Sequence, residues 1–302
     1  MALLKIAYHP IFKHNLPLGH RFPMSKYELL HQQLLHEGTC TEDNFFTPGT
    51  PDEAAILAVH TKDYVQSLRE LTLEPRAARK IGFPLSEKLV EREHVITQGT
   101  VEGCQFALAH GIAMNIAGGT HHAYPDRGEA FCLFNDQAVG ARWLLKHTAV
   151  KKIAIIDLDV HQGNGTAVIF QNEPKVFTFS MHGKSNYPFK KEQSDWDIPL
   201  PNETKDDAYL DTLHKALPKL LDQVKPDFVF YLSGVDILET DKLGKLSCTL
   251  KGCKERDQMV LGTLRRLGIP TQVSMGGGYS PEIKTIIEAH ANTYRVAQQL
   301  YF

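Results

Sequence analysis

Six short apolar runs, spread along the whole chain, limit what this sequence can fold into. Most of them consist mainly of aliphatic and aromatic residues and do not alternate between a buried and a solvated face. Such runs are typical of parallel strands that helices cover on both faces. They are Lys5–Tyr8, Ile112–Ala117, Ile153–Asp159, Val176–Met181, Phe228–Ser233 and Thr271–Met275.

Helical patterns lie between these runs. Ser25–His36 opens with Ser25 and Glu28 at the spacing of a capping box and stops before a glycine. Asp206–Val224 repeats leucines along one stripe, and Pro218 within it predicts a kink.

The last helix has Ser280 as its expected N-cap, with Pro281 in the first turn. Alternating strands and helices predict an α/β fold with a central, mostly parallel sheet between two helical layers. No internal repeat and no linker rich in Gly, Ser and Pro interrupts the pattern. We therefore expect a single three-layer domain over residues 1–302.

Composition narrows the class of protein further. Charged residues make 23% of the 302, and the net charge is −2, which argues against a basic protein that binds nucleic acid directly. No apolar run approaches the ~20 residues that span a bilayer. Five cysteines without a C-x-x-C pair are typical of reduced, buried thiols. We expect a cytoplasmic protein without a membrane span.

Polar residues gather directly after four of the predicted strands. His121 and His122 follow a Gly-Gly pair, and the string Asp157–His161 continues the strand that begins at Ile153. Asp236 follows the strand at Phe228, and Tyr279 comes after three glycines. Because ligands bind at the carboxyl ends of parallel strands, these side chains are predicted to share one rim of the sheet.

The string D-x-D-x-H predicts a metal site. If the strand persists to His161, its period of two points Asp157, Asp159 and His161 to one side. Two buried carboxylates are costly without a compensating charge, and a divalent cation supplies one. Asp236 would complete three protein ligands of an open catalytic site. The alternative is that the acids pair with Lys or Arg, although none lies close in sequence.

Other motifs are weaker evidence for a function. Adjacent histidines are weak on their own, and a tyrosine at this place could be core filling, but glycines beside them allow the backbone to approach a ligand. Gly163 and Gly165 resemble the start of a dinucleotide fingerprint whose third glycine is missing. Neither a nucleophile elbow nor a P-loop is present.

Several segments together resemble the histone deacetylase superfamily, which has the arginase-deacetylase fold. They are GGTHHAYPDRGEAFCLFND, IAIIDLDVHQGNGT, LSGVDILETDKLGKLS and MGGGYS. The agreement runs in order from about Thr97 to the end of the chain. The amino-acid sequence of the last two segments is most similar to the class IV branch. GHRFPMSKYELL resembles the opening helix of the family.

The resemblance implies roles for individual residues. It makes Asp159, His161 and Asp236 ligands of zinc, for which iron(II) is the alternative. His121 and His122 become the catalytic histidines and Tyr279 the residue that polarises the substrate carbonyl.

Further residues are implied around this centre. Asp157 would hold His121, and Asn164 would stand beside His122 where many members have an aspartate. The remaining implied residues line the substrate channel or a potassium site. Phe131, Tyr187, Gly277 and Gly278 would line the channel, and the backbone around Asp157, Asp159 and His161 with Ser180 and Met181 would hold potassium.

The implied activity is hydrolysis of the amide that joins an acyl group, acetyl or a longer fatty acyl, to the ε-amine of lysine in a protein or peptide. An amidohydrolase of small acylated amines such as acetylpolyamines is the alternative within the enzymes. A metal-binding pseudoenzyme is the alternative outside them, but binding alone needs neither the two histidines nor Tyr279.

Overall fold

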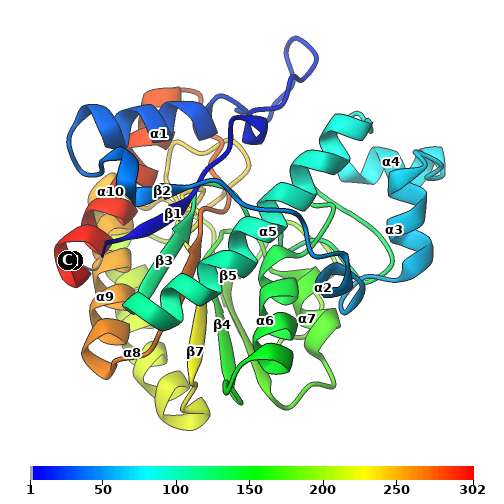
Figure 1. Ribbon diagram of the computed structural model, residues 1–302. Coiled ribbons are helices and arrows are strands. Elements are labelled where there is room, and N and C mark those ends of the chain that lie inside the picture. The colour runs from blue at the N-terminus through cyan, green and yellow to red at the C-terminus, as the bar shows by residue number, and fades with distance from the viewer. Residues whose placement is uncertain (1–2) are drawn as a thin grey trace.

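Eight parallel strands form one sheet in the computed structural model, which describes residues 3–302 (Figure 1). Their order across the sheet is β2-β1-β3-β8-β7-β4-β5-β6, and every neighbouring pair is parallel. The predicted α/β fold with a parallel sheet is confirmed. The strands are β1 (Lys5–Ala7), β2 (Phe45–Phe46), β3 (Ile112–Asn115), β4 (Ile153–Asp157), β5 (Val176–Gly183), β6 (Trp196–Leu200), β7 (Phe228–Leu232) and β8 (Thr271–Ser274).

Each of the six predicted runs contains a strand, and the two unpredicted strands are the edges of the sheet. β2 has only two residues, and β6 is half-exposed and contains Pro199. An edge strand has a neighbouring strand on one side only and is more exposed to solvent, so neither β2 nor β6 carries a continuous apolar run. β4 ends at Asp157, two residues earlier than predicted.

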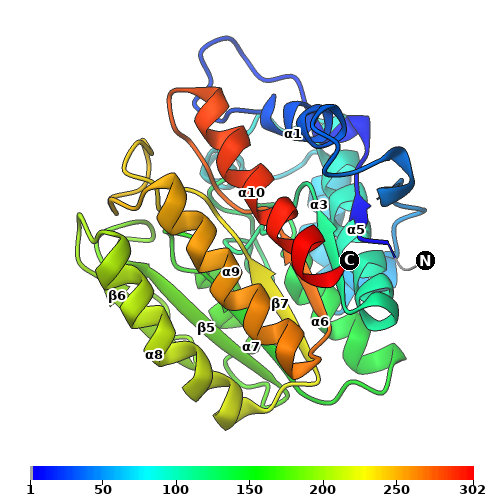
Figure 2. The same cartoon turned by 90° about the vertical axis from the view of Figure 1, so that its left-hand side faces the viewer.

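Helices cover both faces of the sheet, which gives the predicted three layers. α1, α10, α9 and α8 pack in that order on one face (Figure 2), and α5 and α6 pack together on the other. The helices are α1 (Lys26–His36), α2 (Glu53–Leu57), α3 (Lys62–Arg69), α4 (Pro75–Ile81), α5 (Glu87–His110), α6 (Asp136–His147), α7 (Asn164–Phe170), α8 (Asp206–Val224), α9 (Leu250–Leu267) and α10 (Ile283–Tyr301).

Two predicted helix starts differ in detail. The backbone of Ser25 is already helical and its side chain makes no capping bond, while Glu28 forms an ion pair with Lys13 instead. Ser280 shares a 2.7 Å hydrogen bond with Thr240, so α10 begins later, with Glu282 at its N-cap. In both places a partner outside the helix takes the side chain on which the capping prediction relied.

α8 runs without a break from Asp206 to Val224, with Pro218 inside it. The five cysteines are free and buried, as their pattern predicted. Within residues 3–302, no helix combines the length and the apolar character needed to cross a bilayer.

Candidate active site

The four strands whose ends carry the predicted site residues are neighbours in the sheet. β3, β8, β7 and β4 follow one another across its centre, so their carboxyl ends lie at the same edge. The chain leaves β4 at Asp157 and reaches Asp159 and His161 in the turn that follows. Asp236 follows β7 in the same way, and Tyr279 follows β8.

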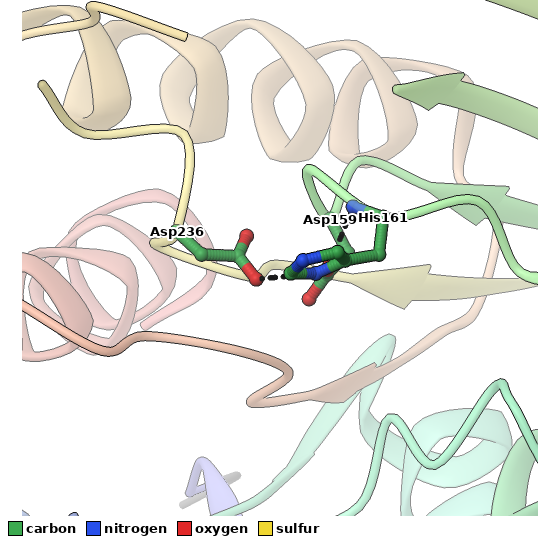
Figure 3. Close-up of side chains that lie close together, drawn as sticks. All are labelled: Asp159, His161 and Asp236. Atoms are coloured by element: carbon green, nitrogen blue, oxygen red, sulfur yellow. Dashed lines mark hydrogen bonds and ion pairs between the residues drawn. The ribbon is translucent and has the colours of Figure 1, made fainter. Parts of the chain in front are cut away.

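Asp159, His161 and Asp236 form a buried cluster at this edge (Figure 3), with one ligand atom from each within 4.8 Å of the others. Nδ1 of His161 lies 3.0 Å from Oδ1 of Asp159 and 3.2 Å from Oδ2 of Asp236. Because β4 has already ended, a turn places these side chains rather than the strand period. The backbone N–H of His161 donates to Oδ1 of Asp159 and fixes that turn.

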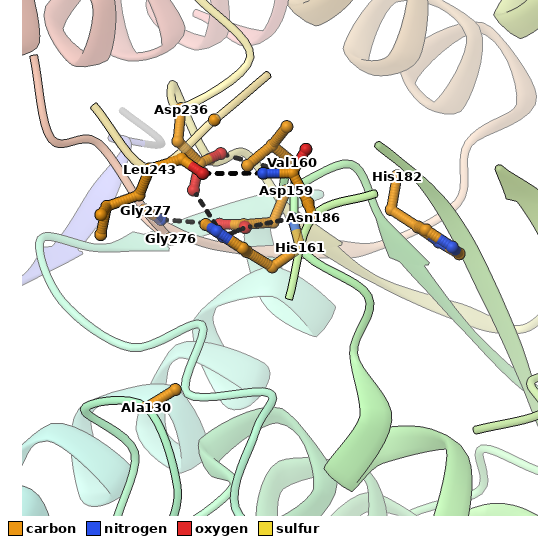
Figure 4. A network of polar contacts seen from close by, with 12 residues as sticks. Ala130, Asp159, Val160, His161, His182, Asn186, Asp236, Leu243, Gly276 and Gly277 are labelled. Atoms are coloured by element: carbon orange, nitrogen blue, oxygen red, sulfur yellow. Dashed lines mark hydrogen bonds and ion pairs between the residues drawn. The ribbon is translucent and has the colours of Figure 1, made fainter. Parts of the chain in front are cut away.

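Backbone donors hold both carboxylates in position (Figure 4). The N–H of Gly277 donates to Oδ2 of Asp159 over 2.8 Å, and the N–H of Val160 donates to Oδ1 of Asp236 over 2.9 Å. Oδ2 of Asp236 is buried and accepts no hydrogen bond among residues 3–302, although Nδ1 of His161 lies within ion-pair distance of it. A buried carboxylate oxygen of this kind is costly unless a cation binds it. Two carboxylates and an imidazole therefore fit a divalent metal ion.

The charges of the cluster lead to the same conclusion. Burial opposes a charge on His161, but its close contacts with the carboxylates of Asp159 and Asp236 outweigh burial and raise its pKa to about 10. Without a metal ion, the imidazolium supplies the positive charge that the two carboxylates require. A divalent cation would displace that proton and take over the same function.

His121 and His122 lie beside the cluster, and each is held by a different kind of partner. Nδ1 of His121 is 2.6 Å from Oδ2 of Asp157, and Nδ1 of His122 is 2.6 Å from Oδ1 of Asn164. Both contacts are those that the resemblance implied. Asp157 thus pairs with a histidine and is not part of the cluster, and the expectation that a strand continues to His161 is wrong because β4 ends at Asp157.

These partners separate the pKa values of the two histidines. Burial acts to lower the pKa of His121, but the Asp157 carboxylate outweighs it and raises that pKa. Burial, with the charges of His121 and His161, lowers the pKa of His122 well below its usual range, and the neutral Asn164 offsets this only weakly. The site thus holds one histidine that favours the charged form and one that favours the neutral form.

Tyr279 enters the site from the glycine turn after β8. A Cβ on Gly277 would lie 2.0 Å from Oδ2 of Asp236, so the backbone passes the cluster at a distance that only glycine allows. Gly278 packs against Val235 behind this turn. The half-buried Tyr279 ring lies 6.5 Å from the ring of His161, and burial raises its pKa well above the usual range, so the phenol keeps its proton.

Aromatic side chains line the approach to the cluster. The ring of Tyr187 meets that of His122 edge-on at 5.0 Å, and the ring of Phe131 lies 6.1 Å from that of Tyr279. Phe131 has a φ of 71°, a strained conformation typical of functional segments. Both residues line an outer cavity of about 390 Å³, which meets an inner cavity of about 40 Å³ beside His161.

Lys26 is a residue of this site that the sequence analysis missed. It is 1% exposed, and its Nζ donates to the carbonyl oxygen of Gly276 over 3.2 Å. Burial lowers its pKa to about 8, although the carboxylate of Asp236 acts in the opposite direction. A signal existed, because Lys26 precedes the buried Leu30 and Leu34 at helical spacing and so occupies the apolar face of α1. No Lys or Arg of residues 3–302 forms an ion pair with the cluster.

The potassium site implied by the resemblance remains a prediction. Asp157 and Ser180 are direct partners in the register of β4 and β5, which brings the implied residues together. The hydroxyl of Ser180 already shares a hydrogen bond with His182.

Comparisons with known proteins place this chain in a family. The pattern of the histone deacetylase domain matches residues 20–294. An uncharacterized protein of Picosynechococcus sp. is 45% identical over 98% of this chain and 99% of its own length. Histone deacetylase 2 of Arabidopsis thaliana is 28% identical over 89% of this chain and 72% of its own. The acetoin utilization protein AcuC of Staphylococcus aureus (strain MRSA252) is 28% identical over 78% and 66%.

Solved structures agree in fold. A crystal structure of an HDAC homologue from Aquifex aeolicus has a TM-score of 0.83 and 24% identity, over 98% of this chain and 84% of that one. An HDAC homologue complexed with SAHA has a TM-score of 0.84 at the same identity and coverage. None of these matches decides the class IV branch, which stays a prediction. On the match over residues 20–294, this chain belongs to the histone deacetylase family.

Proposed function

We propose that this protein is a metal-dependent hydrolase that removes an acyl group from the ε-amine of lysine in proteins or peptides. One observation carries the proposal. Asp159 and His161 of the metal-binding cluster, two histidines with opposite protonation preferences and a protonated Tyr279 all border one cavity, and Asp236 lies behind them in contact with His161. We further propose that residues 1–302 form one catalytic domain and that the protein acts in the cytoplasm, where buried free thiols persist.

Zinc is the metal that we propose, held by Asp159, His161 and Asp236, with iron(II) as the alternative. The oxygen of Asp236 that accepts no hydrogen bond among residues 3–302 and the mixed oxygen and nitrogen donors support this assignment. When bound, such an ion supplies Lewis acidity that polarises an amide carbonyl and acidifies water.

His122 acts as the base in this proposal, because a lowered pKa keeps its imidazole neutral and able to accept a proton from water. His121 acts as the acid, because Asp157 favours its charged form, and it donates a proton to the departing lysine amine. The amine needs that proton because an amide anion is a very poor leaving group.

Tyr279 donates its phenolic proton in a hydrogen bond to the oxygen that becomes negative when the carbonyl is attacked. Its raised pKa supports this assignment, because a phenolate could not donate. Phe131 and Tyr187 enclose the methylenes of the lysine arm and exclude water from it.

The inner cavity favours a short acyl group. A cavity needs about 10–15 Å³ to hold one water molecule. The inner cavity of about 40 Å³ beside His161 therefore suits an acetyl group better than a long chain. Acetyl-lysine is therefore the substrate that we propose first, with longer acyl groups as the comparison.

The test is turnover of one peptide with its lysine acylated by chains of increasing length, together with metal analysis of the same sample. We expect the highest kcat/KM for acetyl, loss of activity after chelation, and recovery on adding zinc or iron(II). A His147→Ala variant on the far end of α6 serves as a control for histidine removal. Metal-loaded protein that hydrolyses none of the acyl-lysines would refute the proposal.

A further inference from the structure

Three exposed cations surround the mouth of the outer cavity. Arg21, Lys80 and Lys245 all line it, and no Asp or Glu is among its lining residues. We call these three side chains the rim cations. They belong to separate segments of the chain, so only the fold gathers them. Because the net charge of the protein is −2, this positive rim is a local feature and not a property of the whole surface.

Among the carboxylates of residues 3–302, only that of Glu129 forms an ion pair with a rim cation, Lys80, and it has two other partners. Glu129 is 9% exposed and accepts a hydrogen bond from Tyr187 as well as pairing with Arg127. Its nearest oxygen is 3.8 Å from Nζ of Lys80, whose side chain is still 62% exposed. Asp241 faces inward, where it accepts hydrogen bonds from three backbone N–H groups.

The mouth is held in a fixed shape. Nδ2 of Asn186 donates to the carbonyl of Leu243 over 2.7 Å and joins the two loops that face each other there. Nζ of Lys191 donates to the carbonyl oxygens of Asn186 and Pro188 and so holds the loop of Asn186 in place. Next to it Phe189 stands 90% exposed at the edge of the cavity.

We propose that the rim cations select acyl-lysine segments in which acidic residues flank the acylated lysine. Phe189 offers an apolar contact to the same segment. This inference rests on the proposed function and names its substrate class. The acyl arm must pass between the cations to reach the cluster, so charges on neighbouring residues of the substrate lie close to them.

The same charges disfavour the competing substrates. A small acylated polyamine carries further ammonium groups, which the rim cations repel, and a lysine-rich tail is repelled in the same way. An exposed ion pair changes affinity by about 1.5- to 5-fold. Three such contacts multiply to about 3- to 125-fold, and we expect a preference of about tenfold within this range.

The experiment compares acetyl-lysine peptides that differ only in their flanking residues, which are Asp and Glu, Ser and Gln, or Lys and Arg. We expect kcat/KM to be about tenfold higher for the acidic than for the basic peptide, mainly through KM. The difference should shrink between about 0.1 M and about 1 M salt, where the Debye length falls from about 10 Å to about 3 Å. Acetylspermidine should be the poorest substrate.

Charge reversal locates the effect. The double variant Arg21→Glu, Lys245→Glu should abolish or invert the preference, whereas Lys219→Glu on the exposed face of α8 should leave it intact. Equal kcat/KM for acidic and basic peptides, while the neutral peptide is hydrolysed, would overturn the rim proposal and leave the proposed function standing.

Binding provides a readout that needs no turnover. Fluorescence anisotropy of the same labelled peptides should show tighter binding of the acidic one, weakened by the double variant. If no peptide is hydrolysed but this order of affinity holds, the rim proposal survives and the proposed function fails. Equal affinities, or tighter binding of the basic peptide, would overturn the rim proposal.

Discussion

At the scale of single residues, the partner of each histidine decides what that histidine does. His121 and His122 are adjacent in sequence and both buried, yet one meets the Asp157 carboxylate and the other the Asn164 amide. A carboxylate favours the imidazolium more strongly than an amide does, so two identical side chains acquire opposite preferences.

Exchanging that amide for a carboxylate should move the pH dependence of catalysis. In Asn164→Asp, the new charge raises the pKa of His122, which must be neutral to accept a proton. The acidic limb of the kcat/KM profile for acetyl-lysine peptide should therefore move to higher pH. Asn172→Asp, the same exchange at an exposed position, should leave the limb where it is. An unmoved limb in Asn164→Asp would contradict the assignment of His122 as the base.

Removal of one hydroxyl tests Tyr279. We expect Tyr279→Phe to bind metal normally and to lose about 10²-fold in kcat, the usual effect of losing one donor to an oxyanion. Metal analysis and steady-state kinetics on one preparation provide the measurement. Tyr8→Phe is the control, since Tyr8 stacks on His31 away from the cluster. Near-normal turnover in Tyr279→Phe would assign the oxyanion contact to another group.

At this scale the sequence predicted the site where its residues were unusual for their surroundings. Acids after an aliphatic strand and a tyrosine after three glycines stand out in the sequence alone. Lys26 gives only a weak signal, its place on the apolar face of α1, because a lysine there can extend its ammonium group to solvent, and only the fold shows that it is buried.

At the scale of elements, the structure follows the apolar patterns closely and the capping patterns less so. Strands buried on both faces are recognisable because most of their residues are apolar, whereas β2 and β6 at the edges carry no such requirement. A cap depends on one side chain. The side chain of Ser25 makes no capping hydrogen bond, and that of Ser280 bonds to Thr240 instead.

Where a cap does form, it also links two helices. The hydroxyl of Thr249 accepts the N–H of Gly252 at the start of α9 and donates to Asp206, the first residue of α8. Thr249→Ala should lower the free energy of unfolding by about 1–2 kcal/mol, measured by urea denaturation. Thr249→Ser keeps the hydroxyl and should stay close to the wild type. Equal stability of all three proteins would mean that this cap contributes nothing.

At the scale of the whole molecule, the Asp159–His161–Asp236 cluster joins the ends of two neighbouring strands. Asp159 and His161 follow β4, and Asp236 follows β7, its partner in the sheet. A cation that binds all three does so only in the folded chain, so binding should stabilise that state.

Metal removal should therefore lower the thermal stability of the protein. We expect the Tm of the stripped protein to rise when zinc is added, by an amount that corresponds to about 2.7 kcal/mol at 100 times the Kd. Differential scanning calorimetry measures the change. His161→Ala lacks one ligand and should show little or no rise. A rise of the same size in both proteins would place the bound zinc elsewhere.

The sequence by itself determined which segments become buried strands and which residues at their ends are candidates for the chemistry, because burial and charge act on each residue locally. Only the tertiary structure decided that β3, β8, β7 and β4 lie side by side, in an order that the chain sequence does not follow. That order brings residues more than a hundred positions apart within hydrogen-bond distance, as for Gly277 and Asp159. It also gathers the rim cations, since exposed lysines and arginines carry no pattern that sequence reasoning could connect.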